Sequence, residues 1–167
     1  MKRTVIFGGK PVELAGEAIK PGHQAPDFTV VNAKLESVKL SDYAGKTRVI
    51  AVYPSIDTGV CQAQNRRFNA EAVNFKNLVV LSVSCDLPFA QRRFCAAEGL
   101  DHVITLSDHR DVDFGKKYGF LMQEVRLLAR GTVIIDPQGI VQYVEYVPEI
   151  TQEPDYEAAL KHLKGSL

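Results

Sequence analysis

The feature that most constrains the fold is an uninterrupted apolar run at residues 49–53, Val-Ile-Ala-Val-Tyr. A strand with one face in water alternates apolar and polar residues, whereas a run that is apolar throughout predicts a strand covered on both faces. Residues 78–85 are predicted to form a second central strand, and a helical pattern follows each of the two. Helices that alternate with buried strands predict an α/β protein in which helices cover both faces of the sheet.

The rest of the chain adds elements at both ends of this core. Alternation around the Gly8-Gly9 pair predicts a β-hairpin over residues 4–14. Further strands are expected at residues 27–31, 37–40, 102–106, 131–135 and 140–146, and further helices at residues 87–98 with Asp86 as the cap, at residues 111–118 and from Pro154 onward. This order predicts a thioredoxin-like fold with a mixed central sheet flanked by helices and an N-terminal β-hairpin, in a single domain over residues 1–167.

Charge and cysteine content exclude several classes of function. Twenty basic side chains balance 20 acidic ones, so no overall field favours binding to nucleic acid or to an anionic membrane. The apolar stretch at residues 5–7 is too short for a signal peptide, and no run approaches membrane-spanning length. Three cysteines, an odd number, do not form a secreted disulfide framework. We therefore expect a cytoplasmic protein without a structural disulfide.

Cys61 is the first candidate for chemistry, because it ends the segment PSIDTGVC directly after the apolar run. A strand that stops at a proline and turns into a helix leaves the N–H groups of the first turn unpaired and directed at one spot. A thiol at that spot is favoured as thiolate, the form that attacks electrophiles. Thr58 can reach back to the sulfur, and Pro54 stiffens the loop. The alternative, a small buried hydrophobe, describes most free cysteines and stays open on composition alone.

The other two cysteines are predicted to lie in different surroundings. Cys85 is in phase with Leu81 and Val83 under the alternation of a strand, which predicts a core side chain. Cys95 lies inside a predicted helix on a polar or boundary face, where oxidation is easier, and its spacing alone leaves a redox role and a plain surface thiol equally open. No two cysteines have dithiol or zinc-knuckle spacing, and no metal ligand pattern joins His23, His102, His109 and His162.

With these residues in view, the chain resembles the bacterial thiol peroxidases, which are atypical two-cysteine peroxiredoxins. The peroxiredoxin pattern is Pro, three residues, Thr or Ser, two residues, Cys, and Pro54, Thr58 and Cys61 match it. The subfamily form is similar to DLPFAQRRFC at residues 86–95, to the AEGL and VITLS that follow, and to ITQEPDYEAAL near the C-terminus. The similarity extends over nearly the full chain.

The resemblance implies a role for each matching residue. Cys61 would be the peroxidatic cysteine, which attacks hydrogen peroxide or an organic hydroperoxide and becomes a sulfenic acid, releasing water or an alcohol. Thr58 and backbone N–H groups would hold the peroxide, Arg130 in LLARGTVIID matches the active-site arginine, and Pro54 would shield the sulfur from water. Cys95 would be the resolving cysteine of an intramolecular Cys61–Cys95 disulfide that thioredoxin reduces. The family also implies a homodimer with no cofactor and no metal.

Two further expectations concern how the cysteines meet. Cys61 opens one predicted helix and Cys95 lies within another, so we expect their Cα atoms to lie beyond the roughly 7 Å that a disulfide spans. The first turn after Cys61 and the helix around Cys95 must then unwind on oxidation. Cys85 is an extra thiol that could pair off-pathway with Cys95, and the stretch from Gly119 to Arg130 is shorter than the resemblance leads us to expect.

Two other functions share part of this evidence. A thioredoxin-like disulfide oxidoreductase is disfavoured, because its two thiols stand close together in the chain and none do here. A redox sensor that signals through the same disulfide would share every residue named above. Only turnover separates the two: an enzyme cycles many times, and a sensor stops after one oxidation.

Overall fold

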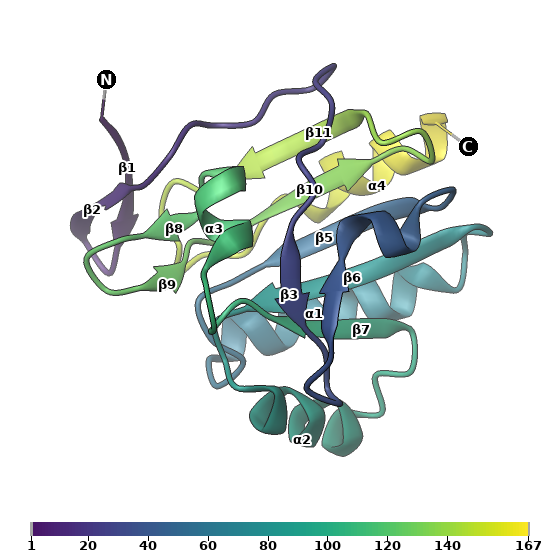
Figure 1. The fold of residues 1–167 in the computed structure, drawn as a ribbon, viewed down its shortest axis with the longest axis horizontal. Helices are drawn as coiled ribbons and strands as arrows, with labels where there is room; N and C mark the ends of the chain where they lie inside the picture. The colour runs from purple at the N-terminus through teal and green to yellow at the C-terminus, as the bar shows by residue number, and fades with distance from the viewer. Residues whose placement is uncertain (1, 167) are drawn as a thin grey trace.

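The computed structural model describes residues 2–166, and its centre is a seven-stranded mixed sheet with the strand order β11-β10-β5-β6-β7-β3-β4 (Figure 1). Strands β5, β6 and β7 run parallel, and the remaining neighbours pair antiparallel. The strands are β3 (Thr29–Val31), β4 (Ser37–Lys39), β5 (Thr47–Val52), β6 (Leu78–Ser84), β7 (Val103–Ser107), β10 (Gly131–Ile135) and β11 (Val141–Tyr146). The predicted thioredoxin-like fold with a mixed sheet is confirmed.

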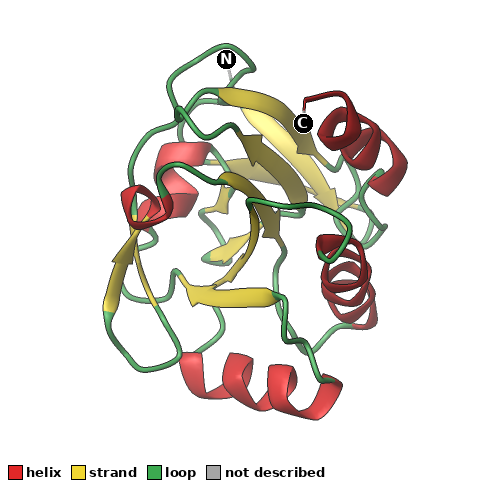
Figure 2. Cartoon of the chain, turned by 90° about the vertical axis from the view of Figure 1, so that its right-hand side faces the viewer, coloured by secondary structure: helices red, strands yellow, loops and turns green. Residues whose placement is uncertain are grey.

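Helices cover both faces of this sheet (Figure 2). The helices are α1 (Gly59–Ala72), α2 (Pro88–Glu98), α3 (Asp113–Tyr118), α4 (Tyr156–Ser166) and the 3-10 turn η1 (Leu40–Tyr43). Helix α4 begins two residues later than expected, because the Asp155 carboxylate accepts the Ala158 N–H and caps it, which leaves Pro154 outside. Among residues 2–166, no helix is long and apolar enough to cross a membrane.

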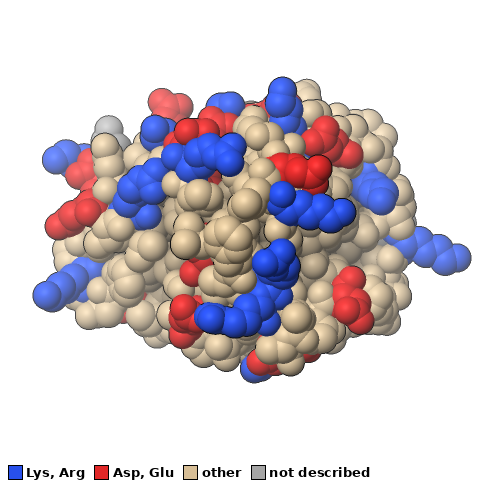
Figure 3. All heavy atoms as spheres, turned by 60° about the horizontal axis from the view of Figure 1, so that its bottom comes forward, with Lys and Arg blue, Asp and Glu red and all other residues tan. Residues whose placement is uncertain are grey.

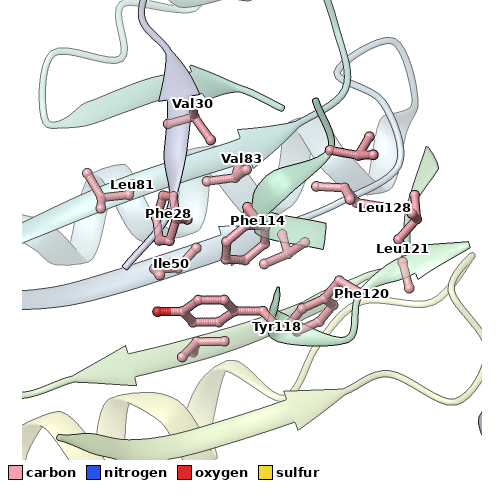
Figure 4. Close-up of a cluster of buried hydrophobic side chains, with 14 of the residues drawn as sticks. Phe28, Val30, Ile50, Leu81, Val83, Phe114, Tyr118, Phe120, Leu121 and Leu128 are labelled. Atoms are coloured by element: carbon pink, nitrogen blue, oxygen red, sulfur yellow. The ribbon is translucent and has the colours of Figure 1, made fainter. Parts of the chain in front are cut away.

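The apolar run of β5 explains why side chains and helices pack against both faces of the sheet. Val49 and Ala51 face a buried layer with α1 and α4, to which α2 contributes at the edge, whereas Ile50 and Val52 face the opposite layer. In that second layer an aromatic cluster packs around α3 with ring centroids 4.7–5.9 Å apart (Figure 4), formed by Phe28, Phe114, Tyr118 and Phe120. Burial of each such side chain contributes about 2 kcal/mol, so both faces stabilise the sheet.

A second, four-stranded sheet, β1-β2-β8-β9, lies at one end of the molecule. The predicted hairpin is present as β1 (Arg3–Phe7) and β2 (Lys10–Leu14), joined by Gly8 and Gly9 with positive φ. Strands β8 (Leu121–Met122) and β9 (Leu127–Leu128) were not expected, because two residues are too few to show a period. The short stretch before Arg130 is therefore paired to the hairpin, through Leu14 and Met122.

Charged side chains of both signs are interspersed on the face drawn in Figure 3. Two arginines of α1 form ion pairs at the surface. Arg66 makes a bidentate pair with Glu98 of α2, with both N–O distances 2.9 Å, and Arg67 pairs with Glu71 and with Glu157 of α4. The outer faces of three helices are thus joined by exposed ion pairs, which salt screens readily.

Candidate active site

Cys61 lies in the first turn of α1, directly beyond the end of β5, and its side chain is fully buried. Thr58 is the N-cap of the helix: its Oγ1 accepts the Cys61 backbone N–H at 3.3 Å and donates to the Ser55 carbonyl at 3.2 Å. In this state the hydroxyl is bonded to the Ser55 carbonyl and the Cys61 backbone N–H, so the expected contact with the sulfur stays a prediction. Thr58 fixes the turn that carries the sulfur, while Pro54 is buried at the start of the same loop.

Arg130 is brought to the same place by the antiparallel pairing of β10 with β5. Gly131 lies opposite Val52, so the residue before β10 reaches the end of β5 from which the Cys61 loop departs. The Arg130 guanidinium donates from Nη1 to the Cys61 sulfur at 3.1 Å, and from Nε to the Ile150 carbonyl at 2.7 Å. With only 2% of its surface exposed, the arginine forms a buried cation held against the thiol.

Gln64 completes this arrangement and was missed by the sequence analysis. Its Oε1 accepts from Arg130 Nη1 at 2.9 Å, while its Nε2 donates to the carbonyls of Val52 and Gly131, each at 3.3 Å. One amide therefore fixes the arginine against both strands that meet at the site. The available signal was its position one helical turn after Cys61, because residues three apart lie on the same helix face.

Asp86 has a role different from the one predicted from the sequence. Helix α2 has Leu87 as its N-cap with no side-chain hydrogen bond, so the predicted cap at Asp86 is wrong. The Asp86 carboxylate instead accepts the Ser55 hydroxyl at 2.9 Å, the Ile56 N–H at 2.7 Å and the Ser84 hydroxyl at 2.6 Å. Donors from the loop before α1 occupy the carboxylate, which ties that loop to the end of β6.

We expect Asp86→Ala to slow the reaction of Cys61 with hydrogen peroxide about tenfold, because three donors of the loop and strand lose their acceptor. Asp86→Asn should keep most of the rate, since the Ser55 hydroxyl can turn to accept from the new amide. The rates of both variants are measured by quenching the reaction with hydrogen peroxide at successive times and quantifying oxidised Cys61 by mass spectrometry. Equal rates for Asp86→Ala and the wild type would show that the carboxylate does not hold the loop.

Cys95 is half-buried in α2, and its sulfur is hydrogen-bonded to the Thr105 hydroxyl. Burial raises the pKa of Cys95, and the bond from Thr105 offsets part of this effect. Of the described residues of α2, it is Phe94 that packs against the cluster of Tyr53, Ile56 and Cys61, whereas Cys95 packs on the layer under α1 and α4. The structure therefore brings Thr58 and Arg130 to Cys61, leaves Pro54 buried at the start of the same loop, and places Cys95 outside the Cys61 cluster, with the cysteines as free thiols.

Cys85 packs on the opposite face of the sheet, with Leu81 and Val83 as predicted. Burial, with a smaller contribution from the charge of Asp108, raises the pKa of Cys85 to about 12. The sheet therefore lies between Cys85 and Cys95 and opposes the off-pathway pairing considered from sequence. Within residues 2–166, no three His, Cys, Asp or Glu side chains are grouped so that they could hold a metal ion.

Comparison with known proteins identifies the family of the chain. The family model described as Redoxin matches residues 20–160. Thiol peroxidases from Oceanobacillus iheyensis and Bacillus subtilis are 55% and 51% identical over 96% of this chain, which aligns with 98% and 96% of their own lengths. The crystal structure of a peroxiredoxin-like protein from Aquifex aeolicus superposes with a TM-score of 0.92 at 39% identity, covering 99% of this chain and 98% of that one. The chain therefore belongs to the Redoxin family, and within it to the thiol peroxidases.

Proposed function

We propose that the protein is a thiol-dependent peroxidase that reduces hydrogen peroxide and organic hydroperoxides to water and alcohols, with Cys61 as the nucleophile. The observation that carries this proposal is the 3.1 Å contact between the Cys61 sulfur and the buried guanidinium of Arg130. A fixed cation in a buried site stabilises negative charge on the reacting atoms. The capped first turn of α1 adds backbone N–H groups on the same side.

In the first step, the thiolate sulfur of Cys61 attacks the terminal oxygen of the hydroperoxide. The S–O bond forms as the O–O bond breaks, and the electron pair of that bond leaves on the departing oxygen, which takes up a proton and is released as water or an alcohol. Sulfur is oxidised to the sulfenic acid, and the Arg130 guanidinium stabilises the charge on the leaving oxygen. Because Cys61 has no exposed surface, a peroxide reaches it only when neighbouring side chains move aside.

In the second step, Cys95 attacks the sulfenic sulfur of Cys61. The S–S bond forms, the S–O bond breaks, and the hydroxide released takes the proton of the Cys95 thiol to give water. Since burial raises the pKa of Cys95 in the folded helix, we expect α2 to unwind before this thiol ionises. Thioredoxin then supplies two electrons and two protons that return both cysteines to thiols. A homodimer is part of the same proposal.

Peptide-mapped mass spectrometry of the reduced protein after one equivalent of hydrogen peroxide tests the cycle. We expect a dominant Cys61–Cys95 disulfide with Cys85 still free, because the sheet isolates Cys85. Repeated consumption of peroxide in the presence of thioredoxin should follow, whereas a redox sensor would stop after one equivalent. A disulfide that contained Cys85, or an unmodified Cys61, would overturn the assignment of the cysteines.

A further inference from the structure

A chain of three buried polar side chains lies beneath the turn that carries Cys61. Tyr53 and Ser82 are fully buried and Asn65 is 1% exposed, so none of them faces the solvent. The Tyr53 hydroxyl lies 2.5 Å from Ser82 Oγ, and Ser82 Oγ lies 2.5 Å from Asn65 Oδ1. Polar groups placed this deep in a protein cost stability unless each is paired, and here each is paired with the next.

The direction of these hydrogen bonds is fixed by their last member. Asn65 Nδ2 donates to the carbonyl oxygen of Cys61 at 2.8 Å, and the opposite amide orientation would place two oxygens against each other. Asn65 Oδ1 must then accept the hydrogen of Ser82, and Ser82 must accept from Tyr53. Burial raises the pKa of Tyr53, which keeps its hydroxyl protonated as the donor that starts the chain.

These three side chains hold the backbone carbonyl of Cys61, whereas Thr58 holds its backbone N–H. The Cys61 N–H is bonded to the Thr58 cap, and the Cys61 carbonyl is bonded to Asn65. The Cys61–Cys95 disulfide requires the first turn of α1 to open, because Phe94 and not Cys95 faces Cys61 while both helices are intact. Opening that turn carries Cys61 away from Asn65 and breaks the bond to its carbonyl.

We propose that Tyr53, Ser82 and Asn65 are positioning residues that set how readily the first turn of α1 opens, and thereby the rate at which the disulfide closes. The inference rests on the proposed function and adds a control to its second step. The same opening rate sets how long the sulfenic acid persists. If a second peroxide molecule reaches Cys61 before Cys95 does, the sulfenic acid is oxidised irreversibly to the sulfinic acid. Stronger hydrogen bonds between Tyr53, Ser82 and Asn65 therefore favour this loss, and weaker ones protect against it.

The test is the rate of each step in Ser82→Ala, which removes the central link of the chain. We expect disulfide closure to be about fivefold faster, the factor that corresponds to one buried hydrogen bond. The first oxidation of Cys61 should change less than twofold, because the closed turn remains the dominant state. Quenched-flow samples, trapped with an alkylating reagent and a sulfenic-acid probe, measure the two steps separately by mass spectrometry.

Thr132→Val is the matched control. Thr132 lies opposite Ala51 and Ala51 opposite Ser82, so both hydroxyls stand in one row on the face that α1 covers. The Thr132 hydroxyl has no hydrogen-bond partner among the described residues, so its removal changes the same layer without touching the chain. We expect wild-type rates for both steps. Tyr53→Phe, which removes one oxygen at the far end of the chain, is a gentler variant that should also accelerate closure.

The outcomes separate the inference from the function on which it rests. Faster closure in Ser82→Ala and Tyr53→Phe, with an unchanged first step and wild-type rates in Thr132→Val, supports the inference. Closure at the wild-type rate in both variants overturns it, even where the wild type forms the disulfide normally. If the wild type forms no Cys61–Cys95 disulfide, the proposed function fails first and the rates are not comparable.

Discussion

Replacing Arg130 with methionine is expected to slow the reaction of Cys61 with hydrogen peroxide by about 100-fold to 1,000-fold, the range found when one donor is removed from a charge-stabilising site. Methionine has a similar length and fills the buried space, but it carries no charge and donates no hydrogen bond to the sulfur or to Gln64. Second-order rate constants at pH 7, from quenched reactions with excess peroxide, measure this loss.

Two further variants show whether the charge or its geometry is responsible. Arg130→Lys keeps the charge but lacks the planar fork that reaches Cys61, Gln64 and Ile150 together, so we expect an intermediate rate. Arg67→Met removes an exposed arginine of the same helix as Cys61 and should leave the rate unchanged. A methionine variant that is folded by circular dichroism and reacts at the wild-type rate would rule out Arg130 as the group that activates the sulfur.

Replacing Gly131 with alanine is expected to lower the free energy of unfolding by about 4 kcal/mol, near the upper end for a single substitution. A Cβ at this position would stand 2.0 Å from the Glu145 carbonyl oxygen and 2.6 Å from the Phe120 ring. The first of these atoms is backbone of the neighbouring strand β11, so a side-chain rotation cannot relieve the overlap. The sheet itself must shift where it carries Arg130.

Denaturant unfolding, followed by circular dichroism, measures the effect. Gly59→Ala is the matched control, since a Cβ there meets no atom within 4 Å and alanine favours the first turn of a helix. We expect its free energy of unfolding to equal or slightly exceed that of the wild type. Equal midpoints for Gly131→Ala and Gly59→Ala would mean that β10 and β11 adapt to the extra carbon, contrary to the packing described above.

Local residues of the site were predictable, whereas those that depend on tertiary contacts were not. The position of Cys61 at a strand-to-helix turn follows from the apolar run before it and the helical spacing after it. Arg130 lies 69 residues away and reaches the sulfur only through the pairing of β10 with β5, so its place came from the resemblance and not from a pattern. Asp86 was taken as a helix cap, because sequence alone does not show that nearby loop donors compete for its carboxylate.

The same division holds for the fold. The strands β5 and β6 are buried on both faces, so their apolar runs predicted them within a residue or two. Strands β8 and β9 have two residues each and exist through their pairing with each other and with the N-terminal hairpin, which no local pattern reveals. Capping set the boundaries of the helices, and Asp155 shows that a cap one residue beyond a proline moves the start of a helix.

The antiparallel placement of β10 beside β5 has a consequence for biosynthesis. A chain that has emerged only as far as α1 already carries Cys61 but not Arg130, which follows 69 residues later. Until β10 adds to the sheet, the Cys61 sulfur has no guanidinium beside it. The site of the proposed reaction is therefore complete only when the sheet is complete, late in the synthesis of the chain.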